Sequence, residues 1–469
     1  MHMLYFHIPV YILESFVWRQ SEFAFFVRQL WLAHFFILGR KKMKKVLSMT
    51  LMLCILMSLL AMMPATVSAA VVDSGTCGEN LTWTLDDTGT LTIRGTGGML
   101  SNPWRSKSNS VKKVVIESGV TVIGDGAFSL CYYLADVTIP NSVTAIGDRA
   151  FYQCSSLTKI TIPDSVTIIG AEAFYRCSSL TNITIPSSVA TIGDGAFASC
   201  EIKDIIVDEV NVNYLSVNDV LYNKNKTILI QYPTGKADAS FVIPDSVTTI
   251  GDYAFEGCES LESIAIPESV TTIGENAFNS TAYYNDMSNW EDYNFLYIGK
   301  HLIKAHGNDT DYSIKEGTKS IAGGAFEWWT DLSSVTIPES VMVIGNRAFA
   351  NCDELTTIYY AGTEQEWNAV SKDDGGILPT TSIICLPKFE CRFNKGNNQI
   401  STTLAHKNLP SGTVFLAATY DENGKILEIK PVTIEQTATF KATDVKDIKV
   451  FAWGDYFSPV IQNVIETIE

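Results

Sequence analysis

Six cysteines stand at one position of a sequence repeat, and their regular spacing could support chemistry. They are Cys131, Cys154, Cys177, Cys200, Cys258 and Cys352. Stacked thiols could hold metal ions or form disulfides, because the Cα atoms of adjacent coils come within disulfide range. The pattern lacks the Cys-x-x-Cys pairs and histidines of zinc sites, and Thr281 and Trp329 take the same position in two other coils. It favours a column of buried free thiols that pack as small apolar residues.

The other reactive side chains form no recognisable catalytic set. Cys77, Cys385 and Cys391 lie outside the column, and a Cys385–Cys391 bridge could form but has no support in the pattern. His301 and His306 lie in an insertion, where we expect solvated surface groups. The third histidine after residue 70 is His406. None of these three histidines belongs to a Ser-His-Asp or His-Glu-x-x-His arrangement. The sequence thus predicts no enzyme, no catalytic residue, no metal site and no cofactor.

Charge excludes one large class of partners. The 469 residues contain 34 Lys and Arg against 51 Asp and Glu, which gives a net charge of −17. Proteins that bind nucleic acid present basic surfaces to phosphate, so this balance argues against a nucleic-acid partner. A hydrophobic content of 46% is ordinary for a globular chain. The length alone would suggest about three domains.

The first 70 residues are typical of an export address. Lys44 and Lys45 precede an uncharged apolar run at 46–63, and small residues follow up to Ala70. This predicts a secretory signal peptide at 43–70, with a retained membrane helix as the alternative. Residues 1–42 precede the signal, so we interpret them as a misassigned upstream extension; a genuine membrane anchor is the alternative. Residues 1–70 contain seven basic and two acidic residues. Residues 71–469 therefore contain 27 basic and 49 acidic residues, which gives this part a net charge of −22.

A 23-residue repeat dominates the middle of the chain. The motif Ile-Gly-x-x-Ala-Phe recurs, once with Ala in place of Gly, and places Phe at positions 128, 151, 174, 197, 255, 278, 326 and 349. Two of the intervals are longer than 23, by 35 and by 25 residues. A fixed period of this kind indicates a solenoid, in which each coil buries its apolar residues against its neighbours. We expect about eight coils with a parallel sheet on one side.

A single unit already shows how one coil is built. Leu157, Ile160 and Ile162 have the spacing of inward side chains on a strand. Pro163 ends this strand, because proline has no N–H for the next ladder bond. A second extended piece follows, and Gly170 then allows a turn that a Cβ would hinder. The Ala-Phe pair returns the chain to the core.

This pattern resembles that of the BspA-like class of bacterial leucine-rich repeat proteins. The sequence L-x-x-I-x-I-P-x-S-V-x-x-I-G-x-x-A-F-x-x-C covers most of residues 111–386. The segments 75–104 and 359–367 resemble the amino-terminal cap and the closing motif of that class, and a solenoid needs caps over its terminal edges. The resemblance implies a leucine-rich repeat solenoid that follows a β cap at 71–110. It also implies adhesion to host matrix proteins, other bacteria or host cells.

Three segments depart from the period. Two insertions, at about 203–240 and 283–312, each place a polar turn between apolar runs, as Asn-Lys-Asn-Lys does at 223–226, and predict hairpins that leave the coil. From 387 to 469 the period is absent and short alternating runs appear, two of them joined by a turn at 421–424. These runs predict a small β-sandwich of the immunoglobulin or fibronectin-III type.

The outward positions of the predicted strands form the remaining candidate site. We assign to the ligand-binding face Asp136, Lys159, Asn182, Ser263, Ser334 and Tyr359. Threonine dominates the second outward column, which also fits a plain solvated strand, because threonine has a high β-propensity. Solenoids commonly bind partners through such a face.

These features predict an exported, non-enzymatic surface or secreted protein whose partner is an extracellular protein or glycan. The leading hypothesis is an adhesin that contacts its partner additively along the solenoid, with no membrane span in the mature protein. The alternative is a glycan-binding module, in which Trp328, Trp329 and Tyr359 could stack on sugars. A hydrolase with a site in the carboxy-terminal sandwich is a third hypothesis, which the lack of a paired histidine and nucleophile disfavours.

Overall fold

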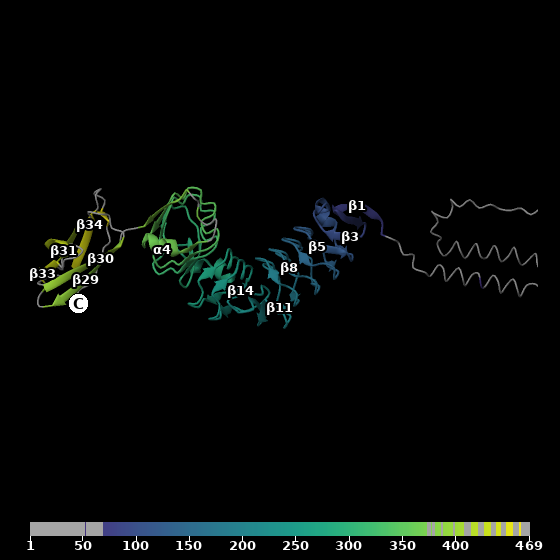
Figure 1. Cartoon of the computed structure of the whole chain (residues 1–469), viewed down its shortest axis with the longest axis horizontal. Helices are drawn as coiled ribbons and strands as arrows, with labels where there is room; N and C mark the ends of the chain where they lie inside the picture. The colour runs from purple at the N-terminus through teal and green to yellow at the C-terminus, as the bar shows by residue number, and fades with distance from the viewer. Residues whose placement is uncertain are drawn as a thin grey trace, which may run out of the picture. The chain divides into compact units, whose positions relative to one another are not determined.

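The computed structural model describes Met52, residues 69–372, Ile377 and residues 380–385, together with the strands found between positions 388 and 460 (Figure 1). The chain divides into two compact units, Met1–Ala69 and Ala70–Glu469. The predicted upstream extension and nearly all of the predicted signal peptide lie outside the described residues. In the described part, no helix has the length and apolar character needed to cross a membrane.

Three antiparallel strands cover the start of the solenoid. They are β1 (Val71–Gly78), β2 (Asn80–Asp86) and β3 (Thr90–Gly98). A short 3-10 helix, η2 (Arg105–Ser110), follows them. β3 pairs in parallel with both β4 (Lys113–Ile116) and β5 (Val120–Ile123). One strand of the cap therefore begins two separate ladders.

Two parallel ladders run along the coils and are interrupted at the insertions. The first is also interrupted between β6 and β9, because residues 157–163 form no strand, so the strand predicted there is not found. The first contains β4, β6 (Asp136–Thr138), β9 (Asn182–Ile185), β11 (Asp204–Val207), β15 (Ser240–Val242), β17 (Ser263–Ala265), β22 (Asp311–Ser313), β24 (Ser334–Ile337), β26 (Thr357–Tyr360) and β28 (Ser382–Cys385). The second contains β5, β7 (Ala145–Ile146), β8 (Ile168–Ile169), β10 (Thr191–Ile192), β16 (Thr249–Ile250), β18 (Thr272–Ile273), β23 (Ser320–Ile321), β25 (Val343–Ile344) and β27 (Ser371–Lys372). Partners in neighbouring coils that carry the motif are one repeat apart, as Ile146 and Ile169 are. The prediction of one sheet was incomplete, because the stacking also pairs the second extended piece of each coil.

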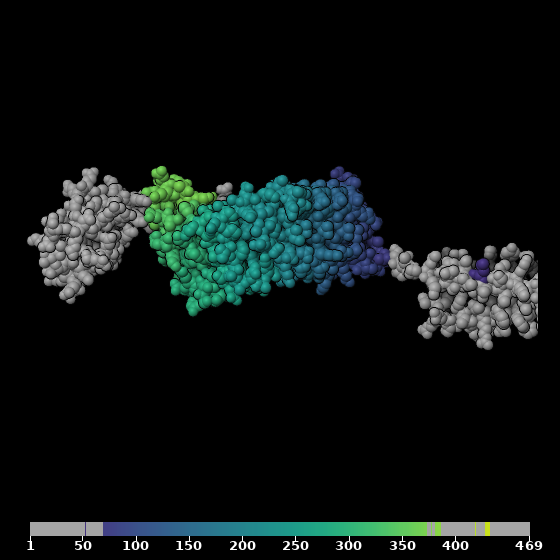
Figure 2. All heavy atoms as spheres, turned by 90° about the horizontal axis from the view of Figure 1, so that it is seen from below, coloured from purple at the N-terminus to yellow at the C-terminus, as the bar shows by residue number. Residues whose placement is uncertain are grey.

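The solenoid has about 13 turns, and they follow one another in sequence order along the molecule (Figure 2). The expected number of about eight is therefore not confirmed. It counted only the coils that carry the Ile-Gly-x-x-Ala-Phe motif or its Ala322 variant, whereas the turns of β3, β11, β26 and β28 continue the stack without it. A turn extends the ladder when its backbone forms hydrogen bonds with the neighbouring turn, and this does not require the side chains of the motif.

The third side of each coil, which we call the turn side, is a pair of tight turns. Each turn holds one residue in the left-handed region, such as Arg149 (φ 55°) and Gln153 (φ 58°) in one coil. Between the two turns the motif phenylalanine enters the core. The rings of Phe151 and Phe174 stack with centroids 5.3 Å apart. Such a pair contributes about 0.5–1.5 kcal/mol beyond its buried area.

The polar residues of the motif are used between coils. Ser165 Oγ donates to Val143 O at 2.6 Å, and Asp148 Oδ1 accepts from the Ala171 amide at 2.8 Å. The serine contact recurs at Ser142, Ser188, Ser269 and Ser340. A Cβ on Gly170 would stand 2.5 Å from Asp148 N in the preceding coil. The motif glycine is therefore needed for the close approach of two backbones.

The two insertions form hairpins that join the second ladder. The first consists of β12 (Tyr214–Val217), β13 (Val220–Asn223) and β14 (Ile228–Gln231). The second consists of α3 (Ala282–Asn285), η3 (Met287–Asn289), β19 (Trp290–Glu291), β20 (Phe295–Ile298) and β21 (His301–Ala305). β14 pairs in parallel with β16, and β21 pairs in parallel with β23. The prediction that the hairpins leave the coil was wrong.

Each inserted hairpin buries both of its faces. Leu221 belongs to the first hydrophobic core, whereas Val220 and Tyr222 belong to a second core. In the other hairpin, Leu296 packs into the second core and Tyr297 into a third. A strand buried on both faces is mostly apolar, and this explains the Val-Leu-Tyr sequence of β13 and the Phe-Leu-Tyr-Ile sequence of β20. The two hairpins divide the solenoid interior, within the described residues, into three cores.

The solenoid closes at α4 (Glu364–Ala369), where Trp367 packs against Tyr360 with ring centroids 5.2 Å apart. Beyond it the described strands form two antiparallel sheets. One sheet contains β29 (Lys388–Gly396), β30 (Gln399–Lys407) and β33 (Ala438–Lys441). The other contains β31 (Val414–Tyr420), β32 (Ile426–Val432), β34 (Asp447–Trp453) and β35 (Pro459–Val460).

We expect Asp148→Ala to destabilise the protein by about 1 kcal/mol, because it leaves the Ala171 amide without its acceptor. The measurement is the free energy of unfolding in urea. Asp164→Ala is the matched control, since Asp164 is exposed in the turn after Pro163; it should change stability by less than about 0.5 kcal/mol. Equal effects of the two substitutions would contradict the role given to the motif aspartate.

Candidate functional site

The six residues assigned to the ligand-binding face lie along the first ladder and do not meet in one pocket. Asp136, Asn182, Ser263 and Ser334 take the same outward position of β6, β9, β17 and β24. Tyr359 lies in the next outward column, between Thr336 and Ile384. Lys159 belongs to the coil between β6 and β9 and lies outside any strand. Their use as a binding face stays a prediction.

The surroundings of these residues leave the face accessible. Asp136 forms an ion pair with Lys113 of the neighbouring strand at 2.8 Å, and both side chains are about half exposed. Exposed pairs of this kind contribute little to stability. Lys159 and Asn182 are exposed, whereas Tyr359 is half-buried. The face therefore offers a row of separate polar contacts and no enclosed site.

The cysteine column consists of buried free thiols, as predicted. All six cysteines are buried and unpaired. Cys177 Sγ donates to Phe151 O at 3.1 Å, and Cys154 makes the same contact one coil earlier. Burial raises the pKa of Cys131 and Cys200 to about 12, so these thiols are unreactive near neutral pH. Within the described part, no group of three or more acidic, cysteine or histidine side chains could hold a metal ion.

His301 is a buried structural residue, and its prediction as a solvated surface group was wrong. Its side chain is only 3% exposed, and Nδ1 lies 2.8 Å from Ser320 Oγ in the adjacent strand. A serine paired with a histidine can be a nucleophile. Ser320 is fully buried, however, so no substrate reaches it. The pair satisfies two polar groups inside the second ladder. His306 is exposed, in agreement with the prediction.

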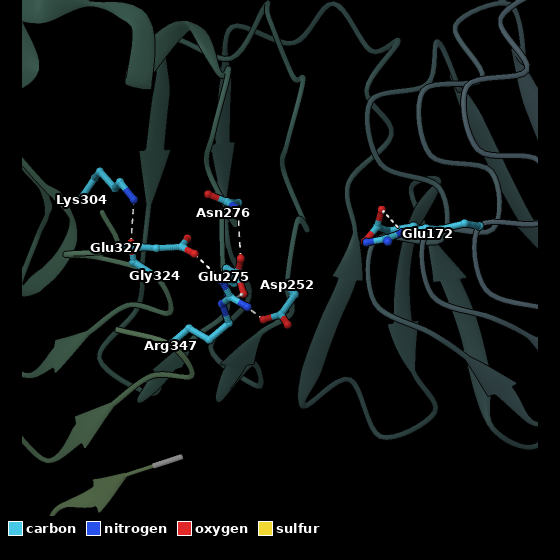
Figure 3. Close-up of polar contacts among 9 residues, drawn as sticks. Glu172, Asp252, Glu275, Asn276, Lys304, Gly324, Glu327 and Arg347 are labelled. Carbon is cyan, nitrogen blue, oxygen red and sulfur yellow. Dashed lines mark hydrogen bonds and ion pairs between the residues drawn. The ribbon is translucent and has the colours of Figure 1, made fainter. Parts of the chain in front are cut away.

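A cluster of charged side chains lies on the turn side where the second insertion ends, and the sequence analysis missed it (Figure 3). Arg347 extends past Gly324 to Glu275, with Nε 3.5 Å from Oε2, and it also pairs with Glu327. Lys304 of β21 donates from Nζ to Gly324 O at 2.7 Å. Because Gly324 has no side chain, the arginine can bridge two coils that are not neighbours.

Burial and mutual attraction set the charges of this cluster. Burial raises the pKa of Glu275, and the nearby Glu327 carboxylate raises it further against the effect of Arg347. Burial lowers the pKa of Lys304, and the two carboxylates oppose that shift. Asp252 adds a third carboxylate, because its Oδ1 accepts from the Glu275 amide at 2.7 Å and its charge also raises the pKa of Glu275, so acidic groups outnumber basic ones in this cluster.

A small cavity opens beside Lys304. The residues that line it include Asn276, Phe278, Asn279, Tyr284 and Gly323. It lies where β21 enters between the coil before the second insertion and the coil after it. Each carboxamide offers both a donor and an acceptor, and an ammonium group offers three donors. Asn276 Nδ2 already donates to Glu275 Oε1 at 3.4 Å, and the cavity has room for no more than one water molecule.

A similar contact spans the first insertion. Tyr175 OH donates to Glu256 Oε1 at 2.8 Å, although 81 positions separate the two residues. Between these two coils lies the coil of Ser199, whose amide donates to Glu256 O at 3.4 Å. Arg149 and Glu172 form an ion pair at 2.7 Å, and Glu172 belongs to the same side as this contact (Figure 3). The turn side thus continues past the insertion without a break.

The comparisons agree with this architecture. A family profile, the BspA type leucine rich repeat region, matches six copies over residues 105–227 and 236–356. The chain belongs to the BspA-type leucine-rich repeat family. Among curated proteins, none matches it.

Several solved structures resemble this BspA-type chain. A leucine-rich repeat protein from Eubacterium ventriosum is 28% identical, with a TM-score of 0.43 over 67% of this chain and 84% of that one. A leucine rich cell surface protein from Faecalibacterium prausnitzii is 25% identical, with a TM-score of 0.35 over 66% of this chain and 100% of that one. A leucine-rich repeat protein from Bacteroides ovatus is 22% identical, with a TM-score of 0.32 over 66% and 78%.

The BspA-type period could not reveal the charged cluster by itself. Glu275, Glu327 and Arg347 occupy three different positions of the repeat, so no single column contains them. One signal was available. Gly324 has the same repeat position as Arg347 of the next coil. Because Gly324 has no side chain, the Arg347 side chain can extend across the coil of Gly324.

We expect His301 to make the protein less stable in acid. Its pKa is about 4 in the fold, against a usual value near 6.5, because burial and the nearby Lys319 disfavour the charged form. The stabilisation is complete above pH 6.5 and is lost as the pH falls towards 4, by roughly 3 kcal/mol in all. Comparing urea unfolding of the wild type and His301→Gln at pH 7 and pH 4.5 tests this. If both proteins lose the same stability, the assignment is wrong.

Proposed function

We propose that this chain is an exported, non-enzymatic binding protein, an adhesin that recognises extracellular macromolecules through the outward face of the first ladder. One observation supports this most. The motif serines, aspartates, cysteines and glycines are all engaged between coils. In the outward columns of the first ladder, Asn182 and Lys159 are exposed and Asp136 makes only an exposed ion pair with Lys113, so this face can present polar side chains to a partner coil after coil.

Export and surface location are part of the proposal. The compact unit that contains the solenoid begins at Ala70, where the predicted signal peptide ends, and β1 begins one residue later. A bacterial surface or secreted protein needs such an address. We also propose that the two carboxy-terminal sheets pack as an immunoglobulin or fibronectin-III type sandwich, since three and four antiparallel strands suit that architecture.

The amino terminus of the protein recovered from the producing cells tests the export proposal. We expect mass spectrometry to place it near Ala70, because the small residues up to that point fit signal-peptidase cleavage. Culture supernatant and cell-surface fractions should contain this shortened form. A terminus upstream of Met43 would contradict both the signal peptide and the assignment of residues 1–42.

Binding to immobilised extracellular matrix proteins and to whole bacteria tests the adhesin proposal. We expect saturable binding that falls by about tenfold or more in Lys159→Glu combined with Tyr359→Ala, because both residues belong to the proposed face. Lys226→Glu is the control, since Lys226 is exposed in the turn between β13 and β14, away from that face. Equal loss in the control, or no loss in the double variant, would reject the first ladder as the binding face.

A glycan-binding module is the second candidate function, and one observation favours it. Trp328 is 68% exposed, an unusual position for so large an apolar side chain. The other aromatic residues of this hypothesis fit less well. Trp329 is only 3% exposed and takes the core position of the cysteine column, so it cannot meet a sugar. Tyr359 is half-buried on the other face.

A further inference from the structure

The first ladder is broken at the first insertion. Within residues 69–372, β11 pairs with β9 alone and β15 pairs with β17 alone, so no strand pairing joins the two parts of the ladder there. On the turn side, however, the coils before and after the insertion meet directly. Ser199 N donates to Glu256 O at 3.4 Å, and a Cβ on Gly257 would stand 3.2 Å from Ser199 Cα. We call this contact between Ser199, Glu256 and Gly257 the junction.

Glu256 brings a buried carboxyl group to the junction. The residue is only 3% exposed, and its Oε1 accepts a hydrogen bond from Tyr175 OH at 2.8 Å. Its Oε2 is buried as well, and no hydrogen bond from the described residues reaches it. A buried carboxylate oxygen without a donor has lost its water and gained no partner in exchange. The ionised form of Glu256 is therefore costly at this place in the fold.

The groups that face Glu256 only partly offset this cost. They come from the coils packed against it and from its own coil, and they are Glu172, Tyr175, Arg176, Ser199, Cys258 and Asn279. Burial raises the pKa of Glu256, and the Glu172 carboxylate raises it further. Tyr175, Arg176 and Asn279 act in the opposite direction without cancelling the effect of burial. Burial also raises the pKa of the Cys258 thiol, which therefore stays uncharged.

Protonation of Glu256 favours the closed junction. A carboxyl group that is buried only when the junction is closed binds its proton more tightly in that state than in an open, solvated one. Its contribution to closure is complete below the usual glutamate pKa of 4.5, and it is lost as the pH rises through the raised value. An open junction would give Oε2 access to water. Ionisation and opening therefore favour each other.

We propose that Glu256 is a pH-sensitive latch between the two parts of the solenoid that meet at the first insertion. The protonated side chain keeps the junction closed, and the ionised side chain lets it open more often. Asn182 lies before the break in the first ladder and Ser263 lies after it. The latch therefore acts on how the two halves of the proposed binding face are held together. This inference goes beyond the proposed function, and it holds whatever the partner is.

Amide hydrogen exchange of the full chain at pH 5 and pH 8, corrected for the intrinsic exchange rate, tests the latch. We expect peptides that cover residues 196–200 and 254–258 to exchange about threefold or more faster at pH 8. Glu256→Gln keeps the shape of the side chain but cannot ionise, so exchange should be slow at both pH values. Glu259→Gln is the matched control, because Glu259 is an exposed glutamate on the same coil. It should keep the pH response of the wild type.

The same pH response in the wild type and in Glu256→Gln would overturn the latch, as would faster exchange at pH 5 than at pH 8. His301 lies at the second insertion and is present in every variant, so its effect in acid cancels in the comparison. If Glu256→Gln fails to fold, Tyr175→Phe decides. It removes the hydrogen bond that favours the ionised form, so the response of the junction should move to higher pH. A response of Tyr175→Phe identical to that of the wild type would reject the latch.

Discussion

Hydrogen bonds between successive coils, stacked about 4.8 Å apart, decide what each residue of this repeat can be used for. Each coil satisfies polar groups of the next: Ser165 binds a carbonyl of the coil before it, and Asp148 binds an amide of the coil after it. The glycine after the motif isoleucine is needed in most coils, as at Gly170, because two backbones come too close for a Cβ. The side chains of the motif residues are therefore already bonded or packed within the solenoid. A partner can be recognised only by the residues at the positions between them.

The same constraint explains the form of the insertions. An extra segment within a ladder leaves two coils unpaired unless it supplies strands of its own. Both insertions do so, since β14 and β21 continue the second ladder into β16 and β23. A hairpin in that place has a core on each side, which is why Leu221 and Tyr222 enter different cores although they are adjacent. On the turn side the coils before and after each insertion still meet, and long side chains such as Tyr175 and Arg347 hold them together.

Much of the fold could be predicted from the sequence, because a residue that recurs every 23 positions has the same surroundings in every coil. The phenylalanine stack, the buried thiols and the first ladder follow from that rule. Features that occur once could not be predicted in this way. His301 was expected at the surface because its insertion was expected to leave the coil. The hairpin instead joins the second ladder, and this buries the His301 side chain. The cluster around Arg347 depends on Gly324, a single small residue whose effect is spatial.

The distribution of charge limits how any partner can be recognised. Basic residues are scarce after residue 70, and several are already paired with carboxylates, as Arg149 is with Glu172 and Lys113 with Asp136. That part of the chain has a net charge of −22. Long-range electrostatic repulsion therefore slows the approach of anionic partners, and it has little effect on neutral ones. The association rate of a neutral glycan would then be low and would depend little on salt concentration. The affinity of the complex would depend on how slowly its contacts dissociate. A repeat that offers the same weak contact in successive coils supplies such affinity through number, which suits a solenoid better than a single deep pocket would.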